Sequence, residues 1–292
     1  MRLSVESYNA SKRFGDEQGL SMIREAGFDC VDYSFYERHD ADVVLGDGYR
    51  EYAKGIRRHL DRIGLICNQA HAPYDFSYGM EMNEETKAYR DIVRAIEAAG
   101  ILGAAVIVVH SIQIDDPEVD AFAYNLSYYQ SFAPYARAAG IRIGVENLFF
   151  TDVKRKTFRA KGRCGADPDE LRRLVAALDP ACFTICVDVG HASLTGYEPE
   201  EFLLALKGAP VTALHIHDGD YLGDRHMLPY TCKFSWSRIM EALREIDYRG
   251  DLTFEIITFL HRVPKEMLPD ALAYAERTGR YLISLFLISL FE

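Results

Sequence analysis

The chain has 292 residues, of which 49% are hydrophobic and 26% charged, the composition of an ordinary globular protein with a sizeable core. Its net charge of −11 argues against a nucleic-acid partner, because phosphate binding normally needs a basic face. The six cysteines form no CxxC pair and the N-terminus does not read as a signal peptide, so we expect reduced thiols and a cytoplasmic location.

Short apolar runs alternate along the chain with longer stretches of helical periodicity, the pattern of repeated strand–helix units. The runs that predict strands are 3–7, 30–34, 66–71, 106–110, 141–147, 183–188, 211–217 and 252–257. The stretches that predict helices are 19–26, 49–63, 84–99, 122–139, 168–178, 199–206, 236–246 and 265–285. Several of these helices are expected to end at a glycine, which closes a helix in the left-handed conformation: Gly27, Gly64, Gly100, Gly140 and Gly208.

Eight strand–helix units predict an α/β fold, a (β/α)8 TIM barrel, formed by a single domain over residues 1–292. A doubly wound open sheet would show a glycine-rich phosphate loop after the first strand, and SVESYNASKRFG (4–15) is not one. The apolar run at 281–291 is too short to span a bilayer, so no membrane partner is expected. We expect this run to end a helix packed on the body, with a contact to another subunit as the alternative.

The longest irregular insertion, 149–165, follows the fifth predicted strand. It is the one strongly basic stretch in an acidic chain, with Lys154, Arg155, Lys156, Arg159, Lys161 and Arg163. Two readings stay open for it: a site for a substrate phosphate, or a solvated surface loop.

Six consecutive predicted strands end in residues that can bind a metal ion. In chain order these are His71, His110, Glu146, Asp188 with His191, His217 with Asp224 and His226, and Glu255. The C-terminal ends of the strands of a TIM barrel meet at one face, where its chemistry takes place. Histidine nitrogen and carboxylate oxygen are the ligands of zinc and manganese, so we expect a metal site there. Asn147 and His215 are candidates to orient the ligands by hydrogen bonds.

Several short motifs at the predicted strand ends are shared with a known family. They are HAPYDF (71–76), VEN (145–147), DVGH (188–191), HIHD (215–218), DRHMLP (224–229) with FSW (234–236), and TFEI (253–256). Together they resemble the sugar phosphate isomerase/epimerase family, xylose isomerase-like TIM barrels of the superfamily that also holds endonuclease IV. One departure is Tyr230-Thr231 after the LP of DRHMLP, where the isomerase-like members usually have a glycine.

The resemblance implies two ligand sets. Ketose 3-epimerases of the superfamily hold one divalent cation, often Mn2+, with residues that align with Glu146, Asp188, His217 and Glu255. Endonuclease IV holds three Zn2+ with nine residues, and here all nine ligand types are present. They align with His71, His110, Glu146, Asp188, His191, His217, Asp224, His226 and Glu255.

The first arrangement implies a metal-dependent sugar or sugar-phosphate isomerase/epimerase that transfers a proton through a metal-stabilised enediolate, with Glu146 and Glu255 as the catalytic acid and base. Its partner is a small-molecule sugar, with Arg225 as a candidate substrate-binding residue and a homodimer as an open option. Aromatic residues near the strand ends suit a sugar-binding wall: Tyr8, Phe35, Tyr74, Phe76 and Phe149. The alternatives are an endonuclease IV-like multi-zinc phosphodiester hydrolase, an inosose dehydratase-like lyase and a non-catalytic binding protein.

Overall fold

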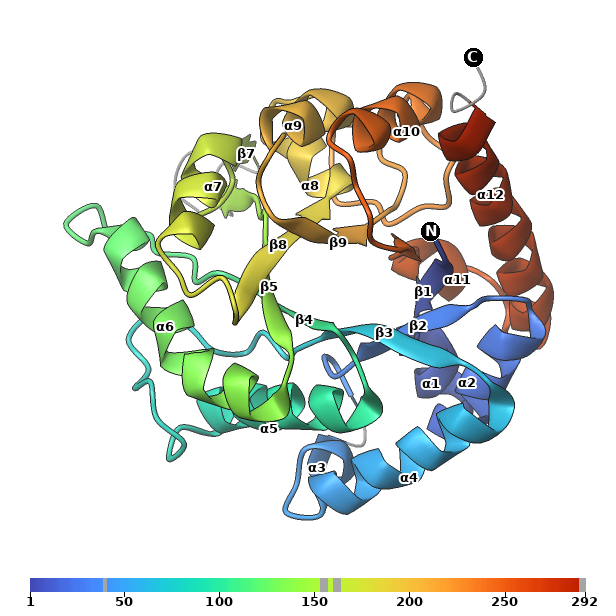
Figure 1. The fold of residues 1–292 in the computed structure, drawn as a ribbon, viewed down its shortest axis with the longest axis horizontal. Helices are drawn as coiled ribbons and strands as arrows, with labels where there is room; N and C mark the ends of the chain where they lie inside the picture. Colours follow the sequence, from blue (N-terminus) through green and yellow to red (C-terminus); the bar gives the residue numbers. More distant parts are fainter. Residues whose placement is uncertain (39–40, 153–156, 160–163, 289–292) are drawn as a thin grey trace.

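Eight parallel strands form a barrel whose outside is covered by helices (Figure 1). The structure is a computed structural model that describes residues 1–38, 41–152, 157–159 and 164–288. The strands are β1 (Leu3–Glu6), β2 (Cys30–Ser34), β3 (Ile66–His71), β4 (Val106–Val109), β5 (Arg142–Glu146), β8 (Phe183–Asp188), β9 (Val211–His215) and β10 (Leu252–Phe254). They pair in the order β10-β1-β2-β3-β4-β5-β8-β9. The ends of this sheet meet where Ile216 N–H donates to Thr253 O at 2.9 Å and Glu255 N–H donates to Ile216 O at 3.1 Å. The predicted TIM barrel is confirmed.

A helix lies in each of the eight stretches predicted to be helical. These are α2 (Asp16–Glu25), α4 (Tyr49–Ile63), α5 (Lys87–Leu102), α6 (Ala121–Ala139), α7 (Pro168–Ala176), α9 (Pro199–Ala205), α10 (Trp236–Glu245) and α12 (Leu268–Ile288). The expected end of α5 at Gly100 was wrong, because the helix continues to Gly103, which has φ 89°. A Cβ on Gly100 would lie 2.7 Å from Ala139 O, so this glycine allows α5 to approach α6 instead of closing the helix.

Short helices that we did not predict lie in the connections between strands and outer helices. They are α1 (Tyr8–Phe14), α3 (Ala41–Val44), α8 (Val189–Leu194), α11 (Ile257–His261) and the 3-10 turn η1 (Lys265–Met267). Elements of one or two turns are too short to show a helical period in the sequence. Among them, α8 matters most for the site, because it begins directly after Asp188.

The basic insertion is less irregular than expected. Its described part forms an antiparallel hairpin of β6 (Phe150–Asp152) and β7 (Thr157–Arg159). The side chain of Arg159 and the other basic residues of the insertion lie outside the described residues: Lys154, Arg155, Lys156, Lys161 and Arg163. The phosphate-binding reading of this insertion stays a prediction.

The C-terminal helix α12 packs on the body, as expected. Leu272, Ala275 and Leu282 are buried in the core, and α12 contacts α10 along the outside of the barrel (Figure 1). Tyr281 and Leu287 stay exposed, and the alternative of a subunit contact stays a prediction.

Of the helices that the described residues form, none is long and apolar enough to cross a membrane.

Candidate metal centre

The nine residues expected to bind metal come together at the C-terminal ends of the strands. All but His110, which lies beside Glu146, belong to three groups whose ligand atoms lie within 4.8 Å of one another, and two of these groups share Glu146 and His215. The groups are His71, Glu146 and His215; Glu146, Asp188, His215 and Glu255; and His191, His217, Asp224 and His226. The structure thus adds His215 to the expected residues, and it groups His217 with Asp224 more closely than with Glu146.

Two imidazoles and a carboxylate meet on one side of the centre. His71 Nε2 and His110 Nε2 lie 3.0 Å apart, and His110 Nε2 lies 2.9 Å from Glu146 Oε2. Burial, and then the neighbouring His110, lower the pKa of His71 well below its usual range, so its ring is neutral at pH 7. Two nitrogens that point at the same carboxylate form a ready set of ligands for a cation.

Three of the histidines have their rings fixed in the same way. In each, Nδ1–H donates to a backbone carbonyl oxygen: His71 to Ala72 O at 2.8 Å, His191 to Asn147 O at 3.0 Å, and His226 to Glu255 O at 3.0 Å. A donating Nδ1 fixes the tautomer and leaves the Nε2 atom of each ring directed into the centre. Metal-binding histidines typically have such an outer hydrogen bond.

Asp188 occupies the turn from β8 into α8. Its Oδ1 accepts from His191 N–H at 2.7 Å, and both of its oxygens lie 3.1 Å from His217 Nε2. The side chain of Asn147 holds the Asp188 backbone with two hydrogen bonds, to its N–H at 2.7 Å and its oxygen at 2.8 Å. Burial opposes ionisation, yet the charges of His191 and His217 lower the pKa of Asp188 to about 2.

Gly190, two residues after Asp188, makes room for the side chain of His217. A Cβ on Gly190 would lie 2.0 Å from Cε1 of His217, which is far inside van der Waals contact. Gly190 therefore provides the space that the His217 ring occupies beside α8.

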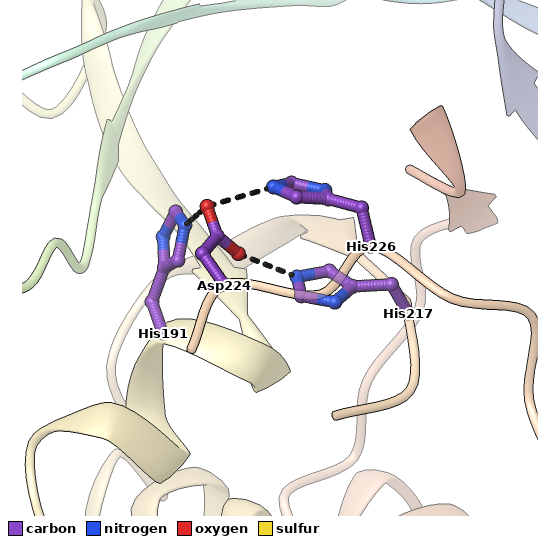
Figure 2. Close-up of side chains that lie close together, drawn as sticks. All are labelled: His191, His217, Asp224 and His226. Atoms are coloured by element: carbon purple, nitrogen blue, oxygen red, sulfur yellow. Dashed lines mark hydrogen bonds and ion pairs between the residues drawn. The ribbon is translucent and has the colours of Figure 1, made fainter. Parts of the chain in front are cut away.

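Asp224 lies at the centre of three imidazoles (Figure 2). Its carboxylate oxygens lie 2.9 Å from His226 Nε2, 3.6 Å from His191 Nε2 and 3.9 Å from His217 Nε2. Burial opposes protonation of His191, but the charges of Asp188 and Asp224 raise its pKa to about 9. Without a cation, this group therefore holds a proton at neutral pH.

The loop that carries Asp224 and His226 is held by Asp218, which is fully buried. The carboxylate of Asp218 accepts five hydrogen bonds from the ends of this loop. The donors are the backbone N–H groups of Gly219, Cys232, Lys233 and Phe234, at 2.9 to 3.1 Å, and Trp236 Nε1 at 3.2 Å. The HIHD and FSW motifs thus meet in one hydrogen-bonded hub.

We expect Asp218→Asn to destabilise the fold by about 1–3 kcal/mol, because an amide nitrogen cannot accept and would leave buried N–H groups unpaired. The loop would loosen, and the affinity of the centre for divalent cations would fall with it. Urea unfolding and titration with Mn2+ or Zn2+ would measure the two effects. The matched control is Asp220→Asn on the same loop, a partly exposed partner of Arg225 that should change stability by less than about 0.5 kcal/mol. Equal losses in the two variants would contradict the role of Asp218.

A second polar layer lies beneath the centre. His215 Nδ1 lies 2.5 Å from Glu146 Oε1, and its Nε2 lies 3.2 Å from Asp32 Oδ2, which also accepts from Gln69 Nε2 at 2.7 Å. Burial would raise the pKa of Glu146, but His215 and His110 lower it well below its usual range. His215 thus connects a ligand to a buried carboxylate on the far side of the barrel, which supports its expected orienting role.

Sequence reasoning missed four residues of this region. Glu6, Asp32 and Gln69 lie in neighbouring strands, where Glu6 pairs with Asp32 and Asp32 with Gln69. The fourth, Tyr36, is buried beside His71, with ring centroids 4.8 Å apart. Burial raises the pKa of Glu6 well above its usual range. The available signal was a charged residue inside an apolar run, as in CVDYS (30–34), since unpaired burial of such a residue is costly.

Arg225 is not brought into the centre. Its Nε lies 2.8 Å from Asp220 Oδ2, and its side chain is partly exposed. Its expected role as a substrate-binding residue therefore stays a prediction.

The five aromatic residues expected to form a sugar-binding wall lie in three different places. Tyr74, Phe76 and Phe149 line a cavity beside the centre. Phe35 packs in the core, and Tyr8 stacks on Tyr36 with ring centroids 5.4 Å apart.

Two adjoining cavities open on the centre. The inner one, of about 110 Å3, is lined by Glu146, Glu255 and several of the histidines. The outer one, of about 390 Å3, shares Tyr74, His110, His191 and Asp224 with the inner cavity and extends toward Phe76 and Tyr128. A substrate that enters through the outer cavity would therefore meet the carboxylates and imidazoles at its inner end.

Comparisons with known proteins agree with this architecture. A family model described as a xylose isomerase-like TIM barrel matches residues 20–277. An uncharacterized protein of Methanocaldococcus jannaschii is 30% identical over 195 residues, which are 63% of this chain and 62% of that protein's length. An L-ribulose 3-epimerase of Mesorhizobium japonicum is 24% identical over 254 residues, 82% of this chain and 74% of the epimerase.

Solved structures show the same fold. A D-tagatose 3-epimerase-like protein superposes with a TM-score of 0.75 at 22% identity, over 99% of this chain and all of that one. A D-psicose 3-epimerase, in the presence of D-fructose, superposes with a TM-score of 0.72 at 14% identity, over 97% of this chain and 99% of that one. At these identities the likeness establishes the fold.

Proposed function

The chain belongs to the xylose isomerase-like TIM barrel family, and on that premise we propose that it is a metal-dependent sugar epimerase or isomerase. The observation that carries this proposal is the position of Glu146 and Glu255. These two buried carboxylates come from different sides of the barrel and have oxygens within 4.8 Å of each other, together with Asp188. The names of two relatives, an L-ribulose 3-epimerase and a D-tagatose 3-epimerase-like protein, support a ketose as the substrate.

The donor set fits a divalent cation. Four buried or partly buried carboxylates, Glu146, Asp188, Asp224 and Glu255, face imidazoles whose Nε2 atoms point inward. Glu146, Asp188, His217 and Glu255 would hold the cation, Mn2+ or Zn2+. When bound, it supplies a Lewis acid that polarises a substrate carbonyl and so acidifies the adjacent C–H.

The residues of the chain would perform the proton transfer. Glu146 is fixed by His215 and His110, so its carboxylate is already ionised and positioned to remove a proton. Glu255 approaches from the end of β10 and would return a proton to the carbon, from the other face in an epimerase. His191, Tyr74 and Tyr36 line the space around them, where they can bind substrate hydroxyls and exclude water.

Solvent isotope exchange would test the proposal. The Mn2+-loaded protein is incubated in D2O with D-ribulose, D-fructose, D-tagatose and D-psicose, and the products are followed by NMR. We expect deuterium at the carbon next to the carbonyl of at least one sugar, together with its epimer or isomer. Absence of exchange with every sugar of a broader ketose and aldose panel would overturn the proposal.

An endonuclease IV-like phosphodiester hydrolase is the second candidate. It is favoured by one observation: eight of the nine residues of the three-zinc arrangement lie in the groups of this centre, and the ninth, His110, contacts Glu146. Nicking of DNA with an abasic site by the Zn2+-loaded protein would support this candidate, and its absence would exclude it. An inosose dehydratase-like lyase would instead appear in the exchange experiment as loss of water from an inosose.

The affinity for the cation is expected to rise with pH. In the metal-free centre, burial raises the pKa of Glu255 to about 8, and the charges of Asp188 and Asp224 raise the pKa of His191 to about 9 against the effect of burial. Glu255 holds a proton below this value, which a cation bound by its carboxylate must displace, and the charge of protonated His191 beside Asp188 repels the cation. Affinity should therefore increase from pH 6 to pH 9, and binding at pH 7 should release protons. Calorimetric titration in two buffers of different ionisation enthalpy would measure this release, and a pH-independent affinity would contradict the expectation.

A further inference from the structure

The space above the candidate centre is divided into two compartments of unequal size and different chemistry. The inner compartment of about 110 Å3 is lined mainly by carboxylates and imidazoles. The outer compartment of about 390 Å3 is more than three times as large. At roughly 30 Å3 per water molecule, the outer compartment holds about a dozen waters and the inner one three or four.

The walls of the outer compartment are largely apolar and well packed. Phe76 and Tyr128 are buried and stack with ring centroids 5.2 Å apart, and the buried Ile112 and Leu148 lie on the same cavity. Tyr74 stacks on His110 with ring centroids 5.0 Å apart. Both residues line both compartments, so they mark the passage between them. The apolar side of this compartment is therefore built from core side chains, while Tyr74 and Ser77 at its edge are exposed.

The inner compartment has room only for the reacting end of a sugar, since it holds about three or four waters and a ketohexose has twelve non-hydrogen atoms. A sugar carries a hydroxyl on almost every carbon, and burying hydroxyls against Phe76 or Leu148 without partners costs free energy. An apolar group would instead displace water from these walls, which is favourable. The polar groups of this compartment, such as Gln113 and Ser77, can serve the remaining sugar hydroxyls, whereas its side at Phe76, Tyr128 and Leu148 is matched to an apolar part of the substrate.

We infer that the substrate is a sugar with a neutral apolar or aromatic substituent, which occupies the outer compartment while the reacting carbons lie in the inner one. The inference rests on the proposed epimerase or isomerase function, because it places the carbonyl at Glu146 and Glu255. The carbonyl and the adjacent carbon must stay unsubstituted for proton transfer. The substituent therefore belongs at the far end of the sugar, as on O6 of a ketohexose.

Three matched series of probes would test the inference. The probes are D-fructose and D-tagatose, their 6-O-benzyl ethers and their 6-phosphates, with kcat/KM measured on the Mn2+-loaded protein. We expect each benzyl ether to have a kcat/KM at least about tenfold above its parent sugar, a range typical for one apolar group in a fitted pocket. Equal or lower values for the ethers would overturn the inference and leave the proposed function standing. A preference for the phosphates would also overturn it.

Measuring the affinity for the probes tests this inference independently of whether the protein turns them over. If no probe is turned over, the proposed function fails for these sugars, and calorimetric titration of the Mn2+-loaded protein with the same probes still decides the inference. Tighter binding of the benzyl ethers than of the parent sugars would support an apolar substituent site. Equal or weaker binding would overturn it.

A variant that fills the outer compartment provides a second test. Gln113 lies on its wall, and Gln113→Trp should reduce the ratio of benzyl ether to parent sugar, in kcat/KM or in affinity, by at least about tenfold. The matched control is Gln130→Trp on the exposed face of α6, which should leave the ratio unchanged. An unchanged ratio in folded Gln113→Trp protein would contradict the assignment of this compartment.

Discussion

Glu146→Gln is expected to lower kcat by about a thousandfold or more while the barrel stays folded. Removal of a positioned general base typically costs 10²–10⁴-fold, and this variant also removes a carboxylate from the cation site. The change keeps the size of the side chain, so the packing of β5 against β4 and β8 should persist. Deuterium exchange into the substrate and far-UV circular dichroism would measure the two effects separately.

The partner residue and a remote glutamate provide the controls. Glu255→Gln should show a comparable loss, because a two-carboxylate mechanism needs both groups. Glu118→Gln is the matched control, since Glu118 is exposed and lines neither cavity, and it should retain full activity. Full activity in either Glu146→Gln or Glu255→Gln would exclude the two-carboxylate mechanism, whatever the identity of the sugar.

The fold could be predicted because its evidence is local and repeated. Each strand–helix unit has its own apolar run and its own helical period, so an error in one boundary leaves the count of eight units intact. The general place of the site could be predicted for a related reason. In a parallel barrel, all C-terminal strand ends lie on one face, so His71, Glu146 and Glu255 had to meet there once the barrel was accepted.

The finer grouping of the ligands could not be predicted, because it depends on strand register. His215 and His217 are two residues apart on an extended chain, so both side chains point to the inside of the barrel. Their depth along the barrel axis differs, and this decides that His215 contacts Glu146 while His217 contacts Asp188 and the Asp224 group. The pairing of β8 with β9 shifts register between Ile185 and Cys186, a break that no sequence periodicity reveals.

The hub at Asp218 was missed for a different reason. In the sequence, Asp218 stands beside the histidines of HIHD, where nothing indicates that its carboxylate has a structural role. The structure directs its carboxylate away from the centre, toward N–H groups 14 to 18 residues further along the chain and Gly219 beside it. An irregular loop that closes on itself has no periodic pattern, so its hydrogen bonds become visible only with the fold. Asp32 belongs to the same class, since its partners Gln69 and His215 come from other strands.

Removal of the metal is the second change with a large expected effect. Treatment with a chelator should abolish isotope exchange, and readdition of Mn2+ should restore it. A cation present at about a thousand times its Kd stabilises the folded state by about 4 kcal/mol, which for a domain of this size corresponds to a rise in Tm of roughly 7 °C. Differential scanning calorimetry with and without Mn2+ would measure the shift, and its absence would argue against a resident cation.

Two aspartates of the centre form a matched pair that locates the cation. Asp188→Asn removes a ligand of the proposed single site and should abolish the Mn2+-dependent rise in Tm, together with activity. Asp224→Asn lies in the neighbouring group of three imidazoles and should leave most of that rise in place if one cation is held by Glu146, Asp188, His217 and Glu255. If the Zn2+-loaded protein instead binds three equivalents and Asp224→Asn loses one of them, the nine ligands act as three sites. The hydrolase would then be favoured over the epimerase, because clustered zinc ions suit the activation of water at a phosphodiester.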